Sequence, residues 1–279
     1  MLEDVSARVV GYVRIGLGAA AVLRGIEAIR ILYPLTDPDV LHFPWFDALP
    51  ALTPTVVTVI VVVWLLSAVM FTVGRRARLS GGVLTAVMAI SMAFDQQAYS
   101  NHLYLLTLLV GLLVLSQPGA AVSLDSRLRG DADTVPGWPI FLIKVQVSIV
   151  YVFAAVTKLN EAFLSGSVLA GSLRLGPISP PDAWLVPGLL SPLALLAVIS
   201  ELVIVTFLWR RRGRGIGVLV GVGLHLSIAL LMAPTLQLVV FAMVMLSSYG
   251  LFFSEQDGST IEELDTSYAD PSVPVVASR

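Results

Sequence analysis

The chain has 279 residues, of which 57% are hydrophobic and 13% charged, and its mean hydropathy is +0.88. A water-soluble domain of this size cannot bury so much apolar surface, so the composition predicts an integral membrane protein in the lipid bilayer, with no nucleic-acid partner. The sequence has no cysteine, which excludes disulfides, iron–sulfur centres and thiol nucleophiles. With three histidines and no cysteine, no metal site is expected. The formal net charge of −2 hides a basic body, because the last 26 residues hold six carboxylates and one arginine.

Eight apolar runs predict membrane-spanning helices, because a helix needs about 20 mostly apolar residues to cross a hydrocarbon core of about 30 Å. The chain starts with MLEDVSARVV, which lacks the basic region and the cleavage site of a signal peptide, so the first run is interpreted as an anchor. Together the runs predict an all-α, polytopic helical bundle over residues 1–253, followed by an acidic, disordered tail over 254–279. The predicted spans are 9–33, 53–74, 81–96, 102–117, 138–163, 185–208, 215–233 and 235–253.

The placement of arginine predicts the orientation of these spans. With the N-terminus in the cytoplasm, the cytoplasmic segments hold ten arginines and the outer loops hold Arg174 alone. This bias predicts a multi-pass protein of the cell membrane with both termini in the cytoplasm. Of the outer loops, 34–52 is rich in aromatic residues and proline, as an interfacial segment would be, and 164–184 is long enough for a short amphipathic helix over the bundle.

Ionisable side chains inside a predicted span indicate either a compensating partner or a function. In the first span, Arg24, Glu27 and Arg30 follow one another at three-residue spacing and can neutralise one another. Glu201 lies in the middle of the sixth span and His225 in the middle of the seventh, and each could be the partner of the other. These five helical positions are therefore open to a purely structural interpretation.

The fifth span contains a stripe of polar residues. Lys144, Tyr151 and Lys158 fall within about 40° of one another around a helix, which predicts that this face lines a cavity. Lys158 is near the outer end of the span, where a lysine can extend to the lipid headgroups or pair with Glu161. In an apolar pocket, however, a lysine that has lost its water becomes a usable base. Both interpretations, anchor and reagent, follow from composition.

The third and fourth spans are joined on the predicted outer side by FDQQAYSNHLYLL, residues 94–106. Asn101 and His102 open the fourth span at the predicted depth of Lys158. A lone histidine here is most simply a structural hydrogen-bond donor, whereas a histidine and a lysine at one depth suggest catalysis.

Four stretches resemble, in order, one family of membrane proteins. LHFPWFDALP (41–50) resembles its "FP..DAL" segment, and QAYSNHLYLLTLL (97–109) its "W.NH.YL..L" segment. KVQVSIVYVFAAVTKLNEAFLSG (144–166) resembles the "GQ..IVYF.AG..KL...W..G" segment, and GVGLHLSIALLM (221–232) occupies the place of a late helix with a histidine. The family is that of the HTTM (horizontally transferred transmembrane) domain, which resembles the membrane domain of vitamin K-dependent gamma-glutamyl carboxylase.

The resemblance implies a quinol-dependent chemistry at the non-cytoplasmic side. In the carboxylase, the lysine of the "KL" segment is taken to deprotonate reduced vitamin K, O2 then adds, and the strong base that results takes a glutamate γ-proton before CO2 adds. The matching residues here are Lys158 as base, His102 for the oxygenated intermediate and Asn101 to orient it. The implied co-substrates are reduced vitamin K or a menaquinone-type quinol, O2 and CO2. The residues expected to contact substrate are Gln97, Tyr99, Tyr151, Glu201 and His225.

The chain departs from the carboxylase pattern. Tyr99 stands where the family has tryptophan, Thr157 precedes Lys158 where the family has a second lysine, and the large luminal portion that binds protein substrates has no counterpart after the bundle. These departures disfavour carboxylation of protein glutamate and favour an epoxidase-type reaction. Two alternatives stay open: a non-catalytic accessory factor for maturation or export of a secreted peptide, and a transporter, which is disfavoured because no internal repeat is visible.

Overall fold

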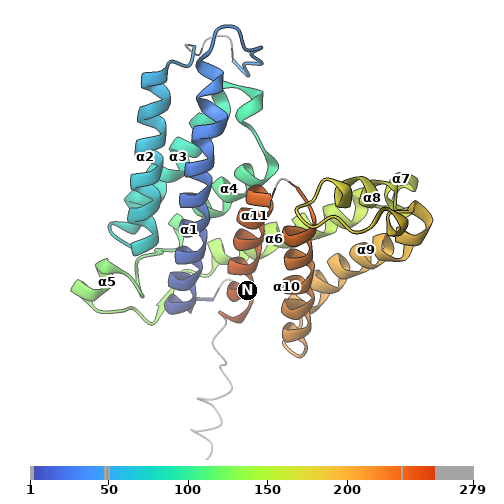
Figure 1. Ribbon diagram of the computed structural model, residues 1–279. Helices are drawn as coiled ribbons and strands as arrows, with labels where there is room; N and C mark the ends of the chain where they lie inside the picture. The colour runs from blue at the N-terminus through green and yellow to red at the C-terminus, as the bar shows by residue number, and fades with distance from the viewer. Residues whose placement is uncertain (1–2, 47–48, 50, 234, 255–279) are drawn as a thin grey trace, which may run out of the picture.

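The computed structural model describes residues 3–46, 49, 51–233 and 235–254, and it confirms an all-α architecture (Figure 1). Each of the eight predicted ranges overlaps a long helix. These helices are α1 (Ala7–Leu32), α2 (Pro54–Val73), α3 (Ala77–Phe94), α4 (Asn101–Leu115), α6 (Trp138–Thr157), α9 (Pro187–Trp209), α10 (Arg214–Leu231) and α11 (Thr235–Tyr249). Shorter elements connect them: α5 (Leu124–Arg129), α7 (Glu161–Leu164), α8 (Ser167–Arg174), the 3-10 helices η1 (Pro34–Thr36), η2 (Gln96–Ala98), η3 (Asp182–Trp184) and η4 (Gly250–Phe253), and the strands β1 (Val5–Ser6) and β2 (Thr134–Val135).

Six segments among the described residues are helical, long and apolar enough to cross a membrane: α2, α3, α6, α9, α10 and Leu236–Phe253, which joins α11 to η4. This identifies a multi-pass membrane protein. Helix α4 has only 15 residues, and α1 carries five charged side chains. The eight-span count and the orientation in the membrane therefore stay predictions.

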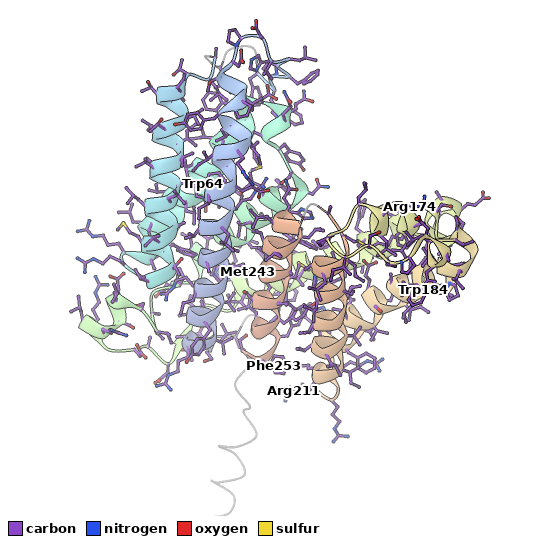
Figure 2. All side chains as sticks on the ribbon, in the orientation of Figure 1. Trp64, Arg174, Trp184, Arg211, Met243 and Phe253 are labelled. Atoms are coloured by element: carbon purple, nitrogen blue, oxygen red, sulfur yellow. The ribbon has the colours of Figure 1, made fainter. Side chains whose placement is uncertain are left out.

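Helix α1 lies at the centre of one half of the bundle, where it packs against α2, α4 and α11 (Figure 1). The buried Trp64 of α2, labelled in Figure 2, donates its indole N–H to the carbonyl of Ala21 in α1 at 2.9 Å. The other half contains α6, α9 and α10, with α6 against α9 and α9 against α10. Helix α11 contacts α1 and α10, so it joins the two halves.

A buried guanidinium holds the end of the bundle where the N-terminus lies. Arg14 is fully buried and donates to the carbonyls of Pro118 (3.1 Å) and Val122 (2.7 Å), in the loop after α4. Strands β1 and β2 pair antiparallel beside it, with Val5 opposite Val135. The start of α1 is thereby attached to a loop more than 100 residues further along the chain.

The fifth predicted span, 138–163, ends earlier than expected. Helix α6 stops at Thr157, with Lys158 as its C-cap. The side-chain oxygen of Asn160 accepts a hydrogen bond from the N–H of Phe163 at 3.0 Å and so starts α7. An asparagine that caps a new helix competes with continuation of the old one, which explains the difference.

The amphipathic helix predicted within 164–184 is confirmed as α8. Its buried residues Leu169, Ala170 and Leu173 pack with Leu185 and with Leu190 of α9. The predicted boundary at residue 254 and the acidic tail lie at and beyond the end of the described residues.

Candidate functional site

The site is built around an ion pair between α6 and α9. The Nζ of Lys158 contacts the Oε1 of Glu201, whose side chain is only 5% exposed against 27% for that of the lysine. Lys158 is placed by the end of α6, and Glu201 by the middle of α9, which packs against α6. The second carboxyl oxygen of Glu201 is buried and has no hydrogen-bond partner among the described residues. Beside the proton that joins them, the pair therefore presents two further ammonium protons and one free acceptor at the same place.

Both partners differ from those suggested by the sequence. Glu201 does not pair with His225, and Lys158 does not pair with Glu161, which is exposed as the first residue of α7. The reason lies in the packing, because α6 and α9 are neighbours and bring Lys158 and Glu201 face to face.

The ion pair lines an apolar cavity of about 440 Å³ between α8, α9 and α10. Its walls are mostly leucine, isoleucine, valine and methionine, and the ring of Phe163 lies 5.7 Å from the Lys158 ammonium. The cavity also receives three serine hydroxyls, each of which donates to a carbonyl of its own helix and keeps lone pairs to accept a ligand's proton. These hydroxyls belong to Ser172, Ser200 and Ser227. The cavity therefore suits a mostly apolar molecule with a hydroxyl group.

A second polar cluster lies on the same face of α6, within the bundle. Lys144 and Tyr151 are both buried, so the polar stripe faces the protein interior, but neither residue lines the cavity that Lys158 lines. The hydroxyl of Tyr151 hydrogen-bonds to the Nε2 of His225 at 2.7 Å and to the hydroxyl of Tyr249. A Cβ on Gly221 would collide with the ring and hydroxyl of Tyr249, so glycine is needed for this approach.

His102 is close to this second cluster rather than at the cavity. Its ring lies 4.6 Å from that of Phe241, and the ring of His225 lies 5.3 Å from the same phenylalanine. The Nδ1 atoms of both histidines are buried without a hydrogen-bond partner in the described part of the chain. One aromatic side chain thus separates the two histidines, while Lys158 has its own carboxylate partner.

The other predicted site residues hold the loop between α1 and α2 against the start of α4. Tyr99 donates its hydroxyl proton to Asn101 at 3.0 Å and packs edge-on against Trp45, 6.2 Å between ring centres. Gln97 donates its side-chain amide to the carbonyl of Leu41 at 2.6 Å. None of these residues lines the cavity with Lys158.

The first span contains the ion pair that the sequence predicted. Arg24 contacts Glu27 and also donates to the hydroxyl of Ser100 at 3.1 Å. Ser100 in turn accepts the N–H of Leu103 and starts α4. This pair therefore has a structural role, since it ties α1 to the beginning of α4.

Several cavity residues were not singled out from the sequence. They come from α9 and α10 at helical spacing, as in Leu193, Ala197 and Ser200, or Val220, Leu224 and Ser227. Because both helices are apolar all round, the cavity face has no contrast in polarity with the lipid face. The one local feature of the sequence that points to the cavity is that Ser200 is adjacent to Glu201 in α9, and this indication is weak.

Comparison with known proteins agrees with the resemblance carried by the four sequence stretches. No solved structure matches the chain. A family model, that of the HTTM domain, matches residues 3–256. Because the match covers most of the chain, including every helix described above, this protein belongs to the HTTM domain family.

Proposed function

We propose that this protein is an integral membrane enzyme that removes the hydroxyl proton of a lipid-soluble quinol, with the Lys158–Glu201 pair as the base. The observation that carries the proposal is the position of this pair at the wall of an apolar cavity. The lysine is the residue that the resemblance to the carboxylase family identifies as the base. Its placement at a cavity, with a buried partner, is what a reagent requires and a headgroup anchor does not.

The pair can take up a proton without creating an unbalanced charge. Whether the shared proton resides on Lys158 or on Glu201, the pair is neutral as a whole. After it accepts a proton from a hydroxyl, it carries one positive charge beside the oxyanion that has formed. In a cavity with few polar groups, such a charge pair stabilises the product of deprotonation more strongly than water would.

The cavity fits a quinol of the menaquinone or vitamin K type. Its volume of about 440 Å³ is within the range of ligand pockets, roughly 300–1,000 Å³. The aliphatic walls can hold a fused ring and the first units of an isoprenoid tail, and the hydroxyls of Ser172, Ser200 and Ser227 can orient a quinol hydroxyl. When bound, the reduced quinone supplies an acidic hydroxyl and two electrons, for which O2 is the oxidant in an epoxidase-type reaction. The proposal covers this quinol half of the carboxylase chemistry, and CO2 addition is outside it.

The test uses purified full-length protein with reduced menaquinone or vitamin K, and measures oxygen consumption and quinone retained after purification. The variant carries Lys158→Met and Glu201→Leu together, which removes the base without leaving an unpaired buried charge. We expect oxygen consumption to fall about 10²–10⁴-fold, as for the loss of a general base. The matched control is Glu161→Gln, which removes an exposed carboxylate near Lys158 and should leave the rate unchanged.

The proposal is wrong if the double variant consumes oxygen at the wild-type rate. It is also wrong if the wild-type protein neither retains quinone nor oxidises it. Co-purification of a small secreted peptide with quinone-free protein would instead favour the accessory role in peptide maturation or export.

A further inference from the structure

We infer that the chain binds the phosphate of an anionic phospholipid headgroup in a cleft lined by Arg76, Arg78 and Arg129. This arginine cleft has a volume of about 540 Å³ and lies between the start of α3, the loop after α4, and α5. It is at the end of the bundle that contains the N-terminus, away from the α7–α8 end of the molecule (Figure 1). The inference is independent of the proposed quinol chemistry.

The three arginines converge on the cleft from different segments. Arg76 belongs to the turn between α2 and α3, Arg78 to the first turn of α3, and Arg129 to the end of α5. All three side chains are exposed, and none forms an ion pair with a carboxylate in the described ranges of the chain. Guanidinium groups that surround one concave space are suited to the oxygens of a phosphate.

The one carboxylate of the cleft is already engaged. Asp125 accepts the backbone N–H of Ala77 at 3.2 Å. It also interacts electrostatically with the buried guanidinium of Arg14 behind the cleft wall. Since Arg14 balances Asp125, the three exposed arginines leave the cleft with an uncompensated positive charge.

The walls of the cleft are fixed by hydrogen bonds rather than by the arginines themselves. Ala132 donates its N–H to the carbonyl of Ala120 at 2.8 Å, and Asp125 donates its N–H to that of Gly74 at 3.2 Å. Arg76 is held at φ +46° and Gln117 at φ +56°, in the left-handed region that glycine occupies more easily. The shape of the site thus exists before a ligand binds, and Arg76 occupies a position where the backbone alone would favour glycine.

Exposed leucines next to the cleft favour the phosphate of a lipid over free inorganic phosphate as the ligand. Leu79 lines the cleft and is 61% exposed, and Leu128, between Arg127 and Arg129 in α5, is 77% exposed. Apolar side chains adjacent to arginines are typical of segments at the boundary between headgroups and acyl chains. A phospholipid can satisfy both, with its phosphate in the cleft and its chains over the leucines.

The experiment compares two variants that lose the same charge at the same end of the bundle. The cleft variant replaces three arginines by glutamine: Arg76, Arg78 and Arg129. The loop variant does the same for three arginines between α9 and α10, of which Arg211 is labelled in Figure 2: Arg210, Arg211 and Arg212. Full-length proteins are reconstituted in nanodiscs of phosphatidylcholine with or without phosphatidylglycerol, and lipid retention is measured by native mass spectrometry.

We expect the wild-type protein to retain phosphatidylglycerol over phosphatidylcholine. The cleft variant should lose about a hundredfold in this preference, from a loss of roughly fivefold per arginine near an anionic surface. The loop variant should lose less than about fivefold, because it leaves the cleft and its three arginines unchanged. Equal losses in the two variants would overturn the inference, as would retention without headgroup preference in the wild type.

Two further measurements separate the remaining explanations. Arg76→Gly removes one charge while relieving the positive φ, so it should weaken lipid retention about fivefold without lowering the thermal stability. A loss of retention through unfolding would instead be accompanied by lower stability. Inorganic phosphate added to delipidated protein should bind far more weakly than the lipid. If it binds with the same affinity and the same dependence on the cleft arginines, the lipid assignment is wrong and the cleft is a site for free phosphate.

Discussion

The ion pair between Lys158 and Glu201 leads to a prediction about stability that does not depend on any activity. Replacing Lys158 by methionine keeps the length of the side chain and leaves the carboxyl group of Glu201, 5% exposed, without its cation. One oxygen of this carboxyl already has no partner among the described residues, so the change leaves both oxygens unsatisfied. We expect the free energy of unfolding to fall by about 3 kcal/mol, which is typical for breaking a buried pair from one side.

The reverse change should be milder. With Glu201→Leu, the 27% exposed ammonium of Lys158 can extend towards the headgroups, so we expect a loss of about 1 kcal/mol. The double variant has no buried charge at all and should lie within about 1 kcal/mol of the wild type. The cycle thus predicts a coupling of about 4 kcal/mol between the two side chains.

The assay is a reversible unfolding titration in mixed micelles, applied to the wild type, both single variants and the double variant. The same double variant is the inactive form in the oxygen-consumption experiment, so its stability also decides whether lost activity reflects lost chemistry. The reasoning is refuted if Lys158→Met alone is as stable as the wild type, or if the second substitution fails to recover the loss.

Four other substitutions test contacts within the bundle and in the loop before α2. Gly221→Ala should destabilise the bundle by about 2 kcal/mol because its Cβ would displace the Tyr249 ring, whereas Gly223→Ala, which meets no atom within 4 Å, should be neutral or stabilise by up to about 1 kcal/mol in thermal unfolding. Ser100→Ala should lower the free energy of unfolding by about 1–2 kcal/mol in the same unfolding assay, because it removes the N-cap of α4 and an acceptor of the Arg24 guanidinium. An unchanged stability would contradict this role. Asp95→Ala should speed hydrogen exchange at Phe43, whose N–H it accepts at 2.9 Å, and equal exchange rates would argue against that attachment.

Much of the helical architecture could be predicted because its signal is local. A run of apolar residues long enough to cross a bilayer specifies a helix regardless of its neighbours, and all eight predicted ranges contain one. The end of α6 was missed because Asn160, an ordinary polar residue in the sequence, acts as a cap only once α7 forms behind it. Helix ends decided by a single side-chain hydrogen bond are not visible in hydropathy.

For the candidate site, the sequence pointed to both residues of the ion pair, Lys158 and Glu201, but neither to their pairing nor to most of the cavity wall. Lys158, Glu201 and His225 stand out because charges and histidines are rare in apolar helices. Which of them meet depends on the order in which α6, α9 and α10 pack, and the sequence contains no direct record of that order. The buried hydrogen bond between Tyr151 and His225 is an example, because the sequence suggested that His225 pairs with Glu201.

The attachment of Arg14 to the loop after α4 has a consequence for biosynthesis. Its two carbonyl acceptors lie 104 and 108 residues downstream, so at about 5–20 residues per second the ribosome delivers them roughly 5–20 s after the arginine itself. In the predicted eight-span arrangement, α1 is in the membrane during that interval with an unpaired guanidinium, which disfavours stable insertion of a lone helix. In that arrangement, α1 becomes a stably inserted helix only when the first four helices have been made, and the N-terminal half of the bundle is expected to assemble as a unit rather than one helix at a time.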